Sequence, residues 1–153
     1  MQVKEAMTQD VTIASPDHSI KDAAKMMAKI DSGILPVGEN DRLVGMITDR
    51  DIAVRAVAAG KSAKTPVREI MSQEVKYCFE DQDLEEVALN MAEIKVRRLP
   101  VLDRSKRLVG ILSLGDMALS NGPDPAGDAL CAISVPGGEH SQQPGEQPRA
   151  HAG

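Results

Sequence analysis

Aromatic side chains are almost absent from this sequence of 153 residues, which has no tryptophan, one tyrosine and one phenylalanine. Its interior must therefore be filled by aliphatic residues, alanine and the eight methionines, whose flexible side chains fit irregular gaps. Cysteine is also scarce, and Cys78 and Cys131 lie far apart with no CxxC spacing. This spacing excludes a disulfide framework and a zinc-finger site, and it favours a reducing cytoplasm.

Long apolar runs and a general excess of basic residues are missing as well. No stretch approaches the length of a membrane span, and residues 1–5 lack the pattern of a signal peptide. The formal net charge of −5 argues against general binding to nucleic acid or to an anionic membrane, because both need a basic surface. Residues 95–107 alone are basic, which predicts a solvated face, with a phosphate-bearing ligand or nucleic acid as alternatives.

Groups that could carry catalysis are also lacking. His18 stands before an expected helix, while His140 and His151 lie near the C-terminus, so none forms a Ser-His-Asp set with a nearby nucleophile. The sequence has no P-loop, no dinucleotide-binding fingerprint and no cluster of metal ligands. We therefore expect no catalytic residue, no metal site and no enzyme activity of the chain by itself.

What the sequence does contain is an internal repeat. Residues 3–11 are repeated as residues 67–75 at an offset of 64. The offset persists through some fifty positions and becomes 65 at Leu43 and Leu108, so one residue was gained in the polar turn before them. Because chance does not keep such a register, the chain is a duplication.

Each copy contains the same series of expected elements. A short extended segment is followed by a helix capped by Ser19 or Asp83, then by a hairpin, then by a second helix that begins after Thr48 or Ser113. Two β-α-β-β-α units of this size cannot each bury both faces alone, and packing sheet against sheet solves the problem. The predicted fold is α/β (α+β), with two repeats packed sheet to sheet as a pseudo-twofold module.

The repeat also sets the expected domain limits. The first copy covers residues 1–60, the linker covers residues 61–66 and the second copy covers residues 67–122. Residues 123–153 are rich in glycine, proline and glutamine, so this C-terminal tail is expected to be largely disordered.

One motif lies where each hairpin meets its second helix. It reads Gly-apolar-apolar-hydroxyl-x-x-Asp, from Gly45 to Asp51 and again from Gly110 to Asp116. A hydroxyl followed three residues later by an acid is a helix cap, and that explanation suffices for either copy taken singly. The same corner suits a nucleotide, because a helix N-terminus attracts phosphate and the acid can accept from both ribose hydroxyls. The glycines of the motif have no side chain, so they leave room for a ligand to approach the backbone closely.

The doubled pattern of apolar-Pro-Val, polar turn, Leu-Val-Gly and hydroxyl-x-x-Asp resembles the CBS domain, named after cystathionine beta-synthase, over residues 3–121. The resemblance implies a two-repeat disc that forms a homodimer, with up to two clefts for AMP, ADP, ATP or a related adenosyl ligand. By motif, Asp51 and Asp116 would hold ribose, while Thr48 and Ser113 would meet phosphate. The adenine would lie against Thr12, Gly33, Ile34 and Pro36 in one cleft, and against Lys76, Arg98 and Pro100 in the other.

The two implied clefts differ in sequence. Arg50, a further candidate contact, corresponds to Gly115, and the pair Gly33–Ile34 corresponds to Arg97–Arg98, so we expect unequal affinities. The leading hypothesis is a regulatory sensor that binds an adenine nucleotide, needs no other cofactor and modulates a partner protein that the sequence does not name. The alternatives are a ligand-free dimerisation module, in which both corners are caps only, and a subunit or fragment of an enzyme.

Overall fold

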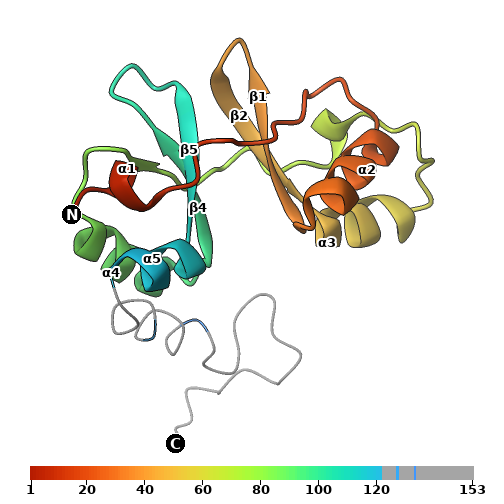
Figure 1. Ribbon diagram of the computed structural model, residues 1–153. Coiled ribbons are helices and arrows are strands. Elements are labelled where there is room, and N and C mark those ends of the chain that lie inside the picture. The colour runs from red at the N-terminus through yellow and green to blue at the C-terminus, as the bar shows by residue number, and fades with distance from the viewer. Residues whose placement is uncertain (122–126, 128–132, 134–153) are drawn as a thin grey trace, which may run out of the picture.

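The computed structural model describes residues 1–121 together with residues 127 and 133. Two similar halves lie side by side, each with a β-hairpin and flanking helices (Figure 1). This is the expected mixed α/β architecture of two repeated units. The predicted C-terminal tail falls outside the described residues, apart from residues 127 and 133.

From its first long helix onward, the first half follows the predicted element order, whereas the expected extended segment before that helix is reduced to a single bridge between Ala14 and Val37. Its elements are the helix α2 (Ile20–Ile30), the strands β1 (Ile34–Glu39) and β2 (Arg42–Thr48), and a second helix made of α3 (Asp49–Asp51) and η1 (Ile52–Val57). β1 and β2 form an antiparallel two-stranded sheet.

The second half repeats this arrangement. Its elements are the short helix η2 (Val67–Glu69), β3 (Cys78–Phe79), α4 (Leu84–Ile94), β4 (Arg98–Leu102), β5 (Leu108–Ser113) and α5 (Leu114–Asn121). β3 pairs in parallel with β4, and β4 pairs with β5 in antiparallel fashion.

The predicted helix caps are confirmed in both halves. The Ser19 hydroxyl accepts a hydrogen bond from the amide of Asp22 at 3.1 Å, and the Asp83 carboxylate accepts one from the amide of Glu86 at 3.3 Å. A side-chain acceptor there satisfies one of the free amides of the first helical turn. These caps fix where α2 and α4 begin, and so they fix the two faces that the helices bury.

The two hairpins differ at the turn where the repeat offset changes. In the first hairpin, Asn40 and Asp41 have φ angles of 55° and 64°, which are the conformations of a tight two-residue turn. In the second, the Asp103 carboxylate accepts hydrogen bonds from the amides of Ser105 and Arg107, both at 2.9 Å. The residue gained in the second copy is therefore accommodated in a longer turn.

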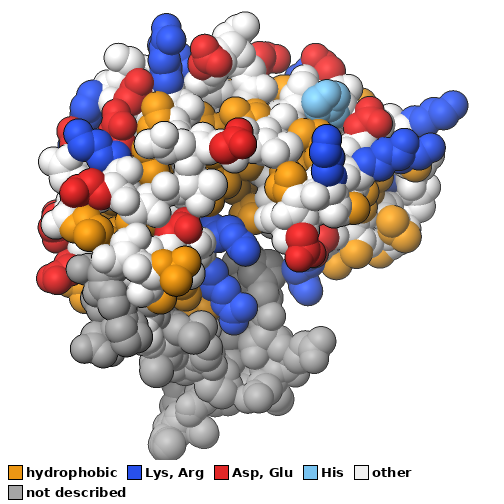
Figure 2. Space-filling model, viewed as in Figure 1, with side chains coloured by type: hydrophobic (Ala, Val, Ile, Leu, Met, Phe, Trp, Pro, Cys, Tyr) orange, Lys and Arg blue, Asp and Glu red, His pale blue; other side chains and the backbone are white. Residues whose placement is uncertain are grey.

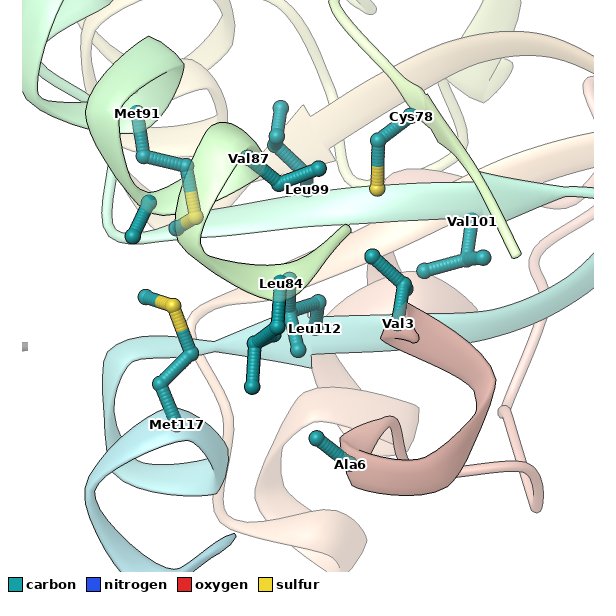
Figure 3. Packing of buried hydrophobic residues seen from close by; sticks show 11 residues of the cluster. Val3, Ala6, Cys78, Leu84, Val87, Met91, Leu99, Val101, Leu112 and Met117 are labelled. Carbon is teal, nitrogen blue, oxygen red and sulfur yellow. The ribbon is translucent and has the colours of Figure 1, made fainter. Parts of the chain in front are cut away.

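The halves exchange their N-terminal segments, which the repeat does not predict. The helix α1 (Val3–Ala6) precedes the first half in sequence but packs into the core of the second half. Figure 3 shows Val3 and Ala6 among side chains of the second half such as Leu84 and Leu112. In return, the first half buries three residues of the second copy in its core, namely Val67, Ile70 and Met71.

Short bridges extend the exchange to the sheets. Thr8 pairs with Ile111 of β5, and Ser72 pairs with Met46 of β2, in both cases through a pair of backbone hydrogen bonds of 2.8–3.0 Å. Each hydrophobic core therefore contains residues from both copies of the repeat. The expected domain limits follow the sequence repeat and stay a prediction.

Cys78 belongs to the core of the second half. Its side chain is almost completely buried, and burial raises the pKa of its thiol from 9.0 to about 12. The thiol is therefore protonated at neutral pH, and a protonated buried thiol is a packing group rather than a nucleophile.

Candidate functional site

Both hydroxyl-x-x-Asp corners are closed by reciprocal capping hydrogen bonds. In the first, the amide of Asp51 donates to Thr48 Oγ1 at 3.0 Å, and the amide of Thr48 donates to Asp51 Oδ2 at 2.9 Å. In the second, the same two bonds join Ser113 and Asp116, both at 3.0 Å. The capping interpretation of the motif is confirmed for both copies.

Each cap leaves one carboxylate oxygen for another partner. Asp51 and Asp116 both use Oδ2 for the cap, and a carboxylate offers about four acceptor positions. Asp51 Oδ1 lies 3.9 Å from Nη1 of Arg55, while the Thr8 hydroxyl lies 3.4 Å from both oxygens of Asp116. A cap and a ribose contact are therefore compatible at the same residue.

A cavity of about 320 Å³ lies at the second corner, between the two halves. Its volume is at the lower end of the range for sites that bind small molecules. It is lined by Thr8, Asp10, Val11, Thr12, Ile30, Asp31, Ser32, Ile34, Pro36, Arg98, Ile111, Ser113 and Asp116.

This lining joins residues that the sequence interpretation assigned to different clefts. Thr12, Ile34 and Pro36 come from the first copy, whereas Arg98, Ser113 and Asp116 come from the second. Arg98 was expected in the opposite cleft from Thr12. The structure places both in one cavity, which is also lined by Ile34, the first residue of β1.

Six other residues that were expected to contact a ligand do not line this cavity, namely Gly33, Thr48, Arg50, Asp51, Lys76 and Pro100. At Gly33, the carbonyl accepts a hydrogen bond from the amide of Asp49 at 2.8 Å. A Cβ atom at position 33 would fall 2.5 Å from Oδ2 of Asp49, so a larger residue there would displace this exposed carboxylate. The second copy has Leu114 in place of Asp49 and Arg97 in place of Gly33, and the amide of Leu114 donates to the carbonyl of Arg97 at 3.1 Å.

The glycines of the two corner motifs have a different role from the expected one. A Cβ atom at Gly45 would lie 2.8 Å from the carbonyl oxygen of Ser72, and one at Gly110 would lie 2.8 Å from that of Thr8. The groups that approach these glycines are therefore the exchanged segments of the chain itself. Our expectation of a ligand close to this backbone is corrected accordingly.

The two second helices differ just after the corners. Beyond Asp51 the chain continues as the π-helix η1, in which the amide of Ala58 donates to the carbonyl of Ala53 at 2.9 Å. After Ser113, α5 is a regular α-helix. Wide helical turns are often found beside functional sites, and here the wide turn makes the two corners unequal in backbone as well as in sequence.

Several lining residues were missed by the sequence interpretation, among them Thr8, Asp10 and Asp31. Thr8 reaches the cavity only because the first segment crosses to the second half. Asp31 ends α2 in a left-handed conformation, with a φ of 53°. The sequence carries a signal for Thr8 in the repeated Met-hydroxyl pair at 7–8 and 71–72, but the pair alone does not reveal the exchange.

Metal-binding groups and membrane-spanning helices would each indicate a different kind of site. Within residues 1–121, 127 and 133, no group of three or more His, Cys, Asp or Glu side chains is arranged to hold a metal ion. In the same part of the chain, no helix is both long enough and apolar enough to cross a membrane.

Comparison with known proteins places the chain in a family. The model of the CBS domain matches residues 3–57 and 67–120. The CBS domain-containing protein YhcV of Bacillus subtilis is 43% identical over 133 residues, which cover 86% of this chain and 94% of YhcV.

Two solved structures show the same fold. The CBS domain pair of protein MJ0100, in complex with 5′-methylthioadenosine and S-adenosyl-L-methionine, has a TM-score of 0.69 and 32% identity, covering 81% of this chain and 98% of that one. CBSX2 in complex with AMP has a TM-score of 0.68 and 26% identity, covering 78% and 94%. Because the family model matches both copies of the repeat, the chain belongs to the CBS-domain family and contains two CBS domains.

Proposed function

We propose that this chain is a regulatory module that binds an adenosine-containing ligand in the cavity between its two CBS domains. The observation that carries the proposal is the lining of that cavity, where apolar residues of β1 face the Ser113–Asp116 corner of the other repeat. In this arrangement the adenine packs against Ile34 and Pro36. The ribose hydroxyls donate to Asp116 Oδ1, which the cap leaves available.

The related structures support this class of ligand. MJ0100 is complexed with 5′-methylthioadenosine and S-adenosyl-L-methionine, and CBSX2 is complexed with AMP. All three molecules contain adenosine and differ in the group at the 5′ carbon. The part of the ligand that we assign to Ile34, Pro36 and Asp116 is the part that these molecules share.

Regulation follows from where the ligand would lie. A molecule held by Thr12 and Ile34 of one repeat and by Asp116 of the other favours one arrangement of the two halves. Coupling between a ligand and a second site in a protein is typically about 1–3 kcal/mol. We propose that a partner protein reads this change, with no catalysis by the chain itself.

A screen of adenosine ligands tests the proposal. AMP, ADP, ATP, S-adenosylmethionine, 5′-methylthioadenosine and NADH are each added in excess, and heat denaturation and calorimetry are recorded. At least one is expected to raise the unfolding midpoint, because a ligand at 100 times its Kd stabilises the native state by about 2.7 kcal/mol. No response to any of the six would overturn the proposal.

Exposed apolar side chains favour a second property, the association of two copies. Val57 on η1 is 67% exposed and Leu119 on α5 is 90% exposed, and both lie on the second helix of a repeat. We propose that these helices meet in a homodimer. Sedimentation equilibrium is expected to give twice the chain mass for the wild type and the chain mass for Leu119→Glu, with Leu89→Glu on α4 as the control. A monomeric wild type, or a dimer unchanged by Leu119→Glu, would contradict it.

A further inference from the structure

The cavity between the repeats carries an excess of negative charge. Three carboxylates line it, from Asp10, Asp31 and Asp116, against the single guanidinium of Arg98. Within residues 1–121, none of these four side chains takes part in an ion pair, so their charges are not neutralised by neighbours in that part of the chain. Acidic and hydroxyl groups predominate among its polar lining, whereas acidic and basic side chains are mixed on the face of the molecule that Figure 2 shows.

The position of Asp31 is unfavourable for the helix that it ends. Asp31 is the C-cap of α2, where the backbone carbonyls give the helix its negative end, and a carboxylate there is repelled. The matching residue in the second repeat is Lys95, with the same left-handed conformation at φ 58°, and its charge suits a helix C-terminus. Aspartate suits the left-handed conformation of this C-cap, but the charge of its carboxylate does not favour the helix end, whereas a role in the cavity gives that charge a use.

We propose that the cavity selects its adenosine ligand by charge, taking an uncharged or cationic one in preference to a polyphosphate. This rests on the proposed function, and it names the class of ligand for that site: an adenosine thioether or sulfonium. A cleft lined by one sign of charge focuses the field on whatever enters it. With Asp116 on the ribose, the phosphates of ATP would meet the carboxylates of Asp10 and Asp31 with only Arg98 to pair with, while a sulfonium or ammonium group would be attracted.

The repeat supplies matched positions for a test. Lys76 stands where the first copy has Thr12, and Lys95 stands where it has Asp31. The charge is thus reversed between the copies at Asp31 and Lys95, while Lys76 adds a charge where Thr12 has none, and neither lysine lines the cavity. Substitutions at Asp31 and at Lys95 alter equivalent helix ends, but only the first alters the lining.

The experiment is calorimetric titration of the protein with 5′-methylthioadenosine, S-adenosylmethionine, AMP and ATP at low ionic strength, with EDTA and again with excess Mg²⁺. With EDTA, S-adenosylmethionine is expected to bind at least about tenfold more tightly than ATP, with AMP between them, because several charge contacts differ. Added salt screens the charges of the cavity, so it is expected to reduce the ratio of the S-adenosylmethionine affinity to the ATP affinity. With excess Mg²⁺, the order of the three affinities is expected to stay the same.

Asp31→Asn isolates the charge, since asparagine keeps the size of the side chain and tolerates the left-handed conformation. It is expected to reduce the ratio of S-adenosylmethionine to ATP affinity about threefold or more, to leave the affinity for 5′-methylthioadenosine unchanged, and not to lower the unfolding midpoint. Lys95→Asn, the control, is expected to leave all of the affinity ratios as they are.

The possible outcomes distinguish a failure of selection by charge from a failure of the proposed adenosine site. If 5′-methylthioadenosine binds but ATP binds more tightly than S-adenosylmethionine, or if Asp31→Asn leaves their ratio unchanged, selection by charge is wrong and the adenosine site stands. If none of the four ligands binds, selection by charge is wrong, and if ADP and NADH also fail to bind, the proposed function is wrong as well.

Discussion

Asp116→Ala is expected to weaken binding of the adenosine ligand about 100-fold, as measured by calorimetry with the tightest ligand of the screen. Hydrogen bonds to a charged group contribute about 1.5–3 kcal/mol each, and the two ribose hydroxyls would both lose their acceptor. The substitution also removes one of the two capping bonds of α5, in which Asp116 Oδ2 accepts from the amide of Ser113 at 3.0 Å, while the Ser113 hydroxyl still accepts from the amide of residue 116. Loss of that one bond costs about 1 kcal/mol in the free energy of unfolding.

Asp51→Ala is the matched control for Asp116→Ala. It removes the equivalent capping bond, in which Asp51 Oδ2 accepts from the amide of Thr48 at 2.9 Å, but Asp51 does not line the cavity. Urea unfolding is expected to show similar losses for the two variants, while only Asp116→Ala loses affinity. Equal losses of affinity in both variants would show that the effect comes from capping or that the two corners bind alike, and either result contradicts our account.

Gly110→Ala is expected to lower the free energy of unfolding by about 2–3 kcal/mol. The added Cβ atom would lie 2.7 Å from Sδ of Met7 and 2.8 Å from the carbonyl oxygen of Thr8. The methionine side chain can move away, but the carbonyl is held in the bridge between Thr8 and Ile111. Urea denaturation with a constant m-value measures the loss.

Two further variants show whether the exchanged segment causes that loss. Gly115→Ala makes the same substitution inside α5, where the nearest atom to the new Cβ is Ser113 Oγ at 3.6 Å, and it is expected to stabilise by about 0.5–1 kcal/mol. In a Met7→Ala background, Gly110→Ala is expected to cost less than it does in the wild type, but still to cost stability, because the Thr8 carbonyl remains. A Gly110→Ala variant as stable as the wild type would contradict the packing of the first segment against β5.

Much of the fold could be predicted from the sequence because local signals agree with the repeat. Ser19 and Asp83 predicted the starts of two helices, and the structure confirms both caps. The change of offset from 64 to 65 predicted that the turns of the two hairpins differ, and they do. In these cases the information lies within a few residues along the chain, where capping and turn preferences act.

The exchange of segments could not be predicted, because it depends on contacts between distant parts of the chain. Val3 and Val67 occupy matching positions in the repeat, and nothing in either segment says which copy will bury it. For the same reason the sequence could not show that Thr12 and Arg98, which were expected in different clefts, line one cavity. The residues of the corner motif were predicted individually, whereas their combination into one cavity is a property of the tertiary structure.

The most direct test of the account is a crystal structure of the protein grown with excess 5′-methylthioadenosine. The account predicts the adenosine in the cavity lined by Ile34, Pro36 and Asp116, with the ribose hydroxyls on Oδ1 and the cap still held by Oδ2. A cavity that stays empty at saturating ligand, or an adenosine bound elsewhere on the molecule, would contradict it.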